Sequence, residues 1–101
     1  MMRYLRVVWL HDFPDEPIEL FSELDEQSQE LRKVERFRDG TFGFADSQRN
    51  SESTRLGLEP IPPPEEIALD PQFQPRMISR AEFDRVWELA LASARAGSSI
   101  G

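Results

Sequence analysis

The alternation of apolar and polar positions begins at residues 3–10, where β-branched and aromatic side chains predominate and two prolines, Pro14 and Pro17, follow. Such side chains suit a pleated sheet, and proline interrupts the hydrogen-bond ladder, so this segment is predicted to be a strand. Its faces carry different apolar residues: Tyr4, Val8 and Leu10 on one, and Leu5, Val7 and Trp9 on the other. Because both faces are apolar, the strand is expected to lie inside the sheet.

Two more strands are predicted at residues 18–24 and 30–38. The residues of the first divide between two faces: Ile18, Leu20 and Leu24 on one, and Glu19, Phe21 and Glu23 on the other. This alternation is typical of a strand with one buried face and one solvated face. In the second strand the apolar residues do not all fall on the same face. If all of them are buried, the strand needs a bulge or a twist near Lys33.

A hairpin is predicted at Asp39-Gly40, which stands between strand-forming residues. A type I′ turn needs positive φ at both central residues, which glycine adopts freely and aspartate tolerates. A two-residue turn here places Phe37 opposite Phe42. A fourth strand at residues 42–45 then carries both of its phenylalanines on one face, and Gly43 between them leaves room for another side chain or backbone.

The middle of the chain is predicted to be irregular. Residues 46–54 contain no large apolar side chain and are expected to form a mobile loop. Residues 55–69 are expected to form a proline-rich strap, with a polyproline II segment at 59–64 and a short helix at 65–69. The Pro60–Pro63 spacing also fits a ligand of proline-binding domains, although such a segment more often crosses a hydrophobic core.

The best-defined element is an amphipathic helix at residues 79–96. Ser79 and Glu82 have the spacing of a capping box, and Ile78 and Phe83 have that of a hydrophobic staple. The apolar stripe of this helix consists of Phe83, Val86, Trp87, Ala90, Leu91 and Ala94. Such a stripe packs on a flat surface, and the remaining residues 97–101 are expected to form a disordered tail.

These elements predict one α+β domain at residues 1–96, formed by an antiparallel meander of about four strands with the C-terminal amphipathic helix packed on one face. A chain of 101 residues supports a single hydrophobic core. Four strands and one helix leave one apolar face of the first strand without a cover. Either the strap or a partner protein is expected to cover it.

Composition narrows the possible functions. The net charge of −7 makes nucleic acid an unlikely partner and favours a protein partner of basic charge. The chain contains no cysteine, which excludes disulfides, a thiolate nucleophile and a cysteine zinc site. We find neither a signal peptide nor an apolar run long enough to span a membrane, so we expect a soluble cytoplasmic protein without a membrane partner.

The densest group of chemically versatile side chains follows the first strand: His11, Asp12, Asp15 and Glu16. Carboxylates can hold Mg²⁺ or Ca²⁺, and a histidine beside them can act as a base near neutral pH. The same residues are ordinary in a turn between strands, which is the interpretation we favour. One histidine without cysteine or a serine motif forms no recognised triad or zinc site, so we predict no catalytic residues, metal or cofactor.

A basic segment at residues 32–38 is the second candidate. Beside aromatic side chains it can bind single-stranded nucleic acid, but cross-strand pairing with Glu19, Glu23 and Glu35 is the favoured alternative. The candidate binding residues of the chain are therefore His11, Asp12, Asp15, Glu16, Arg36 and Arg38.

Several segments, in their order along the chain, resemble a small family of uncharacterised bacterial domains. These are residues 5–9 with 11–17, residues 32–40, Thr54-Arg55-Leu56-Gly57, the Ile61-Pro62 segment, and residues 82–87. The resemblance covers most of the chain. It implies a stand-alone bacterial domain, and it supplies no catalytic motif.

The leading functional hypothesis is a non-catalytic interaction module of the inhibitory, immunity-like kind, whose acidic loops and sheet face bind a protein partner. The alternative is a small metal-dependent or acid–base enzyme that uses His11, Asp12 and Asp15. A nucleic-acid binder that uses residues 32–38 is the third possibility, and it predicts steep salt dependence of binding.

Overall fold

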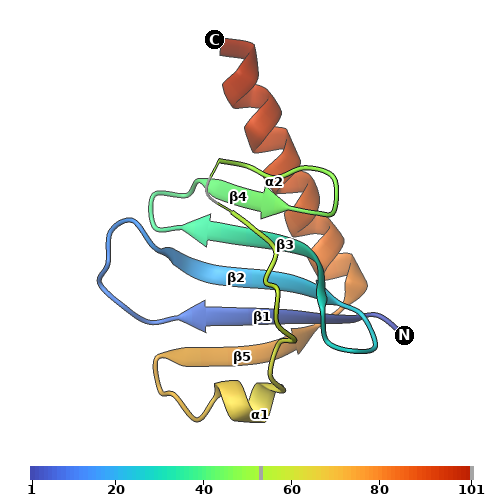
Figure 1. Cartoon of the computed structure of the whole chain (residues 1–101). Coiled ribbons are helices and arrows are strands. Elements are labelled where there is room, and N and C mark those ends of the chain that lie inside the picture. The colour runs from blue at the N-terminus through green and yellow to red at the C-terminus, as the bar shows by residue number, and fades with distance from the viewer. Residues whose placement is uncertain (53, 101) are drawn as a thin grey trace.

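The computed structural model describes residues 1–52 and 54–100, with side chains described as far as Ala94. Its core element is one antiparallel sheet in the order β4-β3-β2-β1-β5 (Figure 1). The strands are β1 Arg3–Trp9, β2 Pro17–Leu24, β3 Glu30–Phe37, β4 Phe42–Ala45 and β5 Phe73–Ile78. The helices are α1 Pro64–Ile67 and α2 Arg80–Ile100. The predicted α+β fold with a C-terminal helix on an antiparallel sheet is confirmed.

The strand β5 is absent from the sequence prediction. It pairs with β1 along its whole length, from Tyr4 opposite Ile78 to Trp9 opposite Phe73. Because β2 pairs with the other side of β1, the first strand lies inside the sheet, as its two apolar faces indicate. Pro75 in the middle of β5 argues against a central strand, but proline is tolerated where the strand forms an edge of the sheet.

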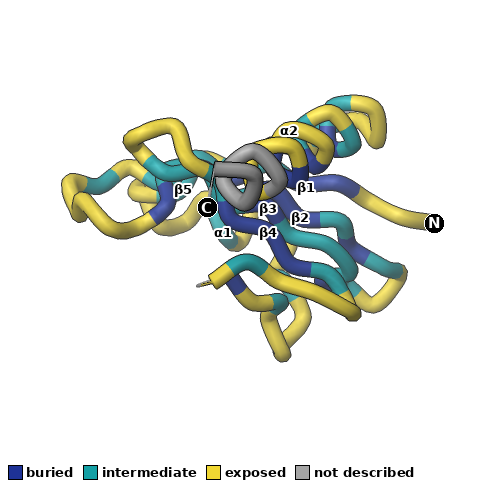
Figure 2. Tube along the Cα trace, turned by 90° about the horizontal axis from the view of Figure 1, so that it is seen from above, coloured by how far each residue is buried: buried dark blue, intermediate teal, exposed yellow. Residues whose placement is uncertain are grey.

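On one face of the sheet, α2 covers the larger hydrophobic cluster (Figures 1 and 2). Phe83 and Trp87 of the predicted helical stripe are buried there. The Trp87 ring meets the edge of Phe44 at a centroid distance of 5.8 Å, and Phe83 lies 5.5 Å from Tyr4. The backbone N–H of Glu82 donates to Ser79 Oγ at 3.1 Å, which confirms Ser79 as the cap of the first turn.

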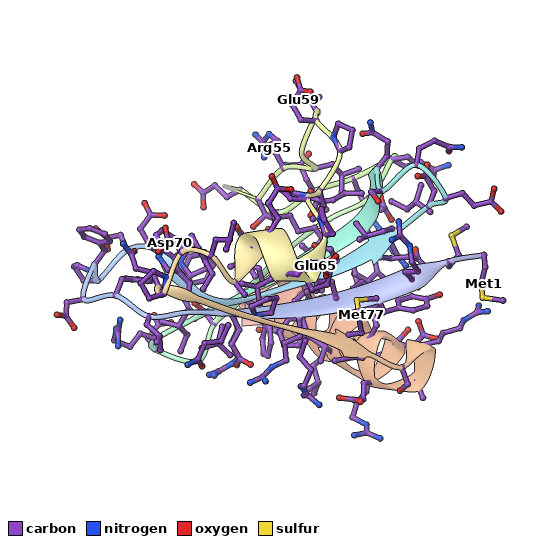
Figure 3. The ribbon with its side chains drawn as sticks, turned by 90° about the horizontal axis from the view of Figure 1, so that it is seen from below. Met1, Arg55, Glu59, Glu65, Asp70 and Met77 are labelled. Atoms are coloured by element: carbon purple, nitrogen blue, oxygen red, sulfur yellow. The ribbon has the colours of Figure 1, made fainter. Side chains whose placement is uncertain are left out.

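The opposite face of the sheet is covered by the strap, the segment 55–69 that includes α1 (Figures 1 and 3). Here Leu5 and Val7 of β1 are buried with Leu24, and Ile61 and Ile67 of the strap pack against them together with Phe73. The strap is therefore the cover of the second apolar face of β1. It is anchored by the Ile61 N–H, which donates to the carbonyl of Ser28 at 2.8 Å.

Of two local predictions about β3, the two-residue turn after it is wrong. The β3–β4 connection is a three-residue loop, because the Phe37 N–H donates to the Thr41 carbonyl and Arg36 stands opposite Phe42. Of the two residues Asp39 and Gly40, only Gly40 has positive φ, at 89°, whereas a type I′ turn needs positive φ at both. The bulge predicted near Lys33 is present at Leu31, because Glu23 stands opposite Arg32 and Leu24 opposite Glu30, which makes Leu31 the extra residue of β3. Even with this bulge, Val34 alone of the three apolar residues of β3 is buried.

The segment 46–54, for which we predicted mobility, is hydrogen-bonded at both ends. The Ser51 N–H donates to the Phe44 carbonyl at 2.8 Å, which continues the pairing of β4. Thr54 is fully buried, and its hydroxyl donates to Glu35 Oε1 at 2.7 Å. Its Oγ1 occupies the place that a Cβ at Gly43 would take, so Gly43 does leave room for another side chain. Residue 53 lies outside the described residues.

The two helices differ slightly from their predicted limits. The short helix α1 covers one turn beginning at Pro64, and its first turn holds Glu65 and Glu66, which complement the helix dipole. The helix α2 continues beyond its predicted end at residue 96 as far as Ile100, and residue 101 of the predicted tail lies outside the described residues. None of the described helices is long and apolar enough to cross a membrane.

Candidate functional site

Two loops meet at one end of the sheet and form a surface that we call the hairpin end, residues 10–16 and 38–41 (Figure 1). The first loop joins β1 to β2, and the second joins β3 to β4. The Arg38 side chain connects them, because its Nη2 donates to the His11 carbonyl at 2.6 Å. The antiparallel order of the strands thus brings together two loops that are far apart in the sequence.

An aromatic series runs along the first loop. The rings of Trp9 and His11 lie 4.2 Å apart, and those of His11 and Phe13 are stacked at 5.4 Å. The indole N–H of Trp9 donates to Gln72 Oε1 at 3.2 Å, which attaches the series to the residue preceding β5. Phe13 remains 58% exposed and Leu10 48% exposed. The hairpin end therefore presents apolar side chains to solvent in a fixed arrangement.

Hydrogen bonds at both ring nitrogens fix the tautomer of His11. Its Nδ1 accepts from the backbone N–H of Phe13 at 2.9 Å, so that nitrogen carries no proton. Its Nε2 lies 2.8 Å from the Pro17 carbonyl oxygen, which can only accept. These hydrogen bonds place the proton on Nε2, and neither nitrogen is free to bind a metal or to act as a base.

Beside the hairpin end, on the face that carries α2, Glu19 lies between two arginines. It is buried, and it accepts from Arg6 Nε at 2.6 Å and from Arg36 Nε. Burial alone would raise the pKa of Glu19, but the hydrogen bonds from both arginines outweigh it and hold that pKa below its usual value. The predicted solvated face of β2 is therefore wrong, because arginines from β1 and β3 enclose this carboxylate.

The structure brings the predicted site residues to the same end of the sheet. A groove of about 430 Å³ is lined, among others, by His11, Asp12, Arg36 and Arg38. Asp15 lines an adjoining hollow with Arg38, and Glu16 lines another with Trp9 and Phe13. Their role in binding stays a prediction. Sequence reasoning missed two further residues of this region, Trp9 and Phe13. Basic residues on β1 and β3 and acidic residues on β2 indicate ion pairs between neighbouring strands, which include Arg6 and Glu19.

The basic segment at residues 32–38 is largely engaged in ion pairs. Arg32 contacts Glu23 at 2.7 Å and Arg36 contacts Glu19, while Lys33 lies 3.9 Å from Glu35. The predicted cross-strand pairing is confirmed for Glu19 and Glu23, whereas Glu35 pairs with Lys33 of its own strand β3. Among the cations of this segment, Arg38 is the one that faces the loops of the hairpin end.

The acidic side chains of the first loop are not gathered around a common point. Within residues 1–52 and 54–100, no three histidine or carboxylate side chains lie close enough together to hold a metal ion. Asp12, Asp15 and Glu16 are instead exposed along the loop. Their arrangement along the loop offers no common point at which they could coordinate one ion.

The fold and this surface define a small α+β domain whose exposed loops meet at one end of a helix-covered antiparallel sheet. The chain belongs to a family of domains of unknown function, DUF6881, whose model matches residues 3–92. The match covers all five strands and most of α2. No curated protein and no solved structure matches the chain.

Proposed function

We propose that this domain is a non-catalytic protein-interaction module of the inhibitory, immunity-like kind, and that the hairpin end contacts its protein partner. The observation that carries the proposal is the aromatic series of Trp9, His11 and Phe13, which is partly exposed and held by hydrogen bonds. A few residues supply most of the binding energy at a protein interface, and tryptophan, tyrosine and arginine are enriched among them. A surface that is already ordered loses little conformational entropy on binding.

The charges of the hairpin end favour a basic partner. Asp12, Asp15 and Glu16 are exposed, and none of them takes part in a salt bridge within the described part of the chain. The guanidinium of Arg38 is directed to the His11 carbonyl. Such a negative tip on a chain of net charge −7 steers a basic protein toward it and disfavours acidic competitors.

The geometry gives less support to the enzyme hypothesis that uses His11, Asp12 and Asp15. A general base needs a free nitrogen within reach of its substrate, and both ring nitrogens of His11 are engaged in the loop. For the environment of the domain we propose a bacterial cytoplasm. The absence of cysteine fits a reducing compartment, and the resemblance of residues 5–9 and 11–17 to bacterial domains supports the origin.

Photo-crosslinking from Phe13 tests the proposal. A benzophenone amino acid replaces Phe13 in one protein and Leu89, a similarly exposed apolar residue on α2, in the control protein. Both proteins are irradiated in the native host, and covalent adducts are identified by mass spectrometry. The proposal expects one basic protein captured from position 13 and not from position 89. Equal capture from both positions, or only the abundant proteins of the cell, would reject it.

A further inference from the structure

A second groove lies on the opposite face of the sheet, between the strap and the strands. It has a volume of about 450 Å³, its floor includes Leu5 and Leu20, and its walls include Ile61, Ile67 and Phe73. This surface is distinct from the hairpin end groove, because Leu5 and Arg6 are successive residues of β1 and point to opposite faces. The strap thus covers Leu5 and Val7 and still leaves an apolar channel beside them.

The rim of this groove is acidic. Between residues 55 and 72 the chain holds one basic side chain, Arg55, and four exposed acidic ones: Glu59, Glu65, Glu66 and Asp70. Glu66 and Asp70 line the groove directly. None of the four takes part in a salt bridge within the described residues. Figure 3 shows Glu59 on the strap and Glu65 and Asp70 around α1, all on the side of the sheet opposite α2.

The cations of this face are already engaged. The guanidinium of Arg55 donates to backbone carbonyls of the preceding loop, including that of Thr54 at 3.0 Å. Lys33 at the end of the groove lies 4.0 Å from Glu30 and 3.9 Å from Glu35. The negative charge of the rim is therefore not compensated locally among the described residues.

Two large apolar side chains lie beside the groove without any cover. Leu58 is 92% exposed and Leu69 is 80% exposed, and their sequence neighbours Gly57 and Asp70 line the groove. An apolar channel flanked by exposed leucines and surrounded by uncompensated carboxylates has the composition of a peptide-binding surface. The carboxylates specify the charge of what binds, and the channel specifies an apolar anchor.

We propose that this groove binds a basic peptide segment of a protein, with an aliphatic side chain in the channel and flanking lysine or arginine residues against Glu65, Glu66 and Asp70. The inference concerns a surface separate from the hairpin end and does not depend on it. A short segment suffices, because α1 is one turn long and its residue Glu66 lines the groove.

The test titrates the purified full chain with a labelled peptide that has two leucines between pairs of lysines. Binding is located by amide chemical shifts and quantified by fluorescence anisotropy. We expect shifts concentrated at Gly57, Ile61 and Ile67, and affinity at least about tenfold lower when serines replace the leucines. A peptide with glutamates in place of lysines is expected not to bind.

Matched charge variants separate the groove from general electrostatic attraction. The Glu65→Gln/Glu66→Gln protein is compared with Glu52→Gln/Glu88→Gln, which removes the same charge at exposed positions outside the groove. We expect about fivefold weaker binding for the first and less than about twofold for the second. Equal losses, shifts outside the groove, no binding at about 1 mM peptide, or self-association through this face in sedimentation would each overturn the proposal. Thermal unfolding of each variant confirms that it is folded.

Discussion

The guanidinium group of Arg32 on β3 donates two hydrogen bonds to the carboxylate of Glu23 on β2, at 2.7 and 2.9 Å. A third bond, at 3.0 Å, reaches Asp84 on α2. The same group lies 4.8 Å from the ring centre of Phe83, on the helix face that packs against the sheet. Arg32 therefore links both layers of the domain at the edge of the larger hydrophobic cluster.

Replacement of Arg32 by methionine is predicted to lower the free energy of unfolding by about 2–4 kcal/mol, because it leaves the partly buried Glu23 carboxylate without its main partner. Urea denaturation measures this change. Arg85→Met, at an exposed position of α2, is the control and is expected to cost less than about 0.5 kcal/mol. Similar costs for the two variants would show that Arg32 contributes no specific link.

Stability is predicted to fall at acidic pH. The pKa values of Glu19 and Glu23 lie below their usual 4.5: two arginines outweigh the burial of Glu19, and hydrogen bonding to Arg32 lowers that of Glu23. A lowered pKa in the folded state adds stability that is fully present above the unfolded value and is lost as pH falls through the folded value. The free energy of unfolding should therefore be nearly constant above about pH 5 and decline below about pH 4.5.

The variant Glu19→Gln gives the control for this pH dependence. Without the Glu19 carboxylate, the acid-induced decline should be shallower and the stability near neutral pH lower, because Arg6 and Arg36 lose their shared partner. An unchanged decline in this variant would contradict the role assigned to Glu19.

The substitution Gly43→Ala is predicted to cost about 1–3 kcal/mol, because the added Cβ meets the hydroxyl of the buried Thr54. In a Thr54→Ala background the cost should shrink, and a double-mutant cycle measures the coupling. Gly40→Ala is a matched glycine control. No atom lies within 4 Å of a Cβ there, so its cost of about 1 kcal/mol comes from positive φ alone and should be independent of Thr54. Additive effects at Gly43 and Thr54 would contradict this packing.

The tautomer of His11 can be observed directly. Long-range ¹H–¹⁵N spectra at about pH 8 are predicted to show one neutral species with the proton on Nε2, because Nδ1 accepts from the Phe13 N–H. The protein unfolded in urea provides the reference and should show both tautomers in exchange. A proton on Nδ1 in the folded protein would mean that the loop is organised differently and that His11 is available for chemistry.

The sequence predicts four strands, the short helix and α2, because each has a local signal of alternation, proline placement or capping. It does not predict β5, since Phe73–Ile78 contains Pro75 and three exposed residues, Gln74, Arg76 and Met77, and becomes a strand only by pairing with the distant β1. Local propensity carries no information on such pairing. The loop between β3 and β4 is one residue longer than predicted for a related reason, since aspartate and glycine fit several turn types.

For the candidate site, the residue types at positions 10–16 indicated a candidate site in that loop. The arrangement of the loop depends on contacts with distant residues, which no local sequence pattern contains. The bond from Arg38 to the His11 carbonyl joins residues 27 positions apart, and the Trp9 indole bonds to a residue 63 positions away. The acid-rimmed groove was also hidden, because the strap was predicted as a cover but not the channel that remains beneath it.

The most direct test of the central claim measures the affinity of the captured partner for the domain by isothermal titration calorimetry. Two variants are compared with the wild type: Phe13→Ser at the hairpin end and Leu89→Ser on α2, both at exposed apolar positions. If the hairpin end is the binding surface, Phe13→Ser weakens binding by about tenfold or more, while Leu89→Ser changes it by less than about twofold. Unchanged affinity in Phe13→Ser would contradict the assignment of this surface to a protein partner.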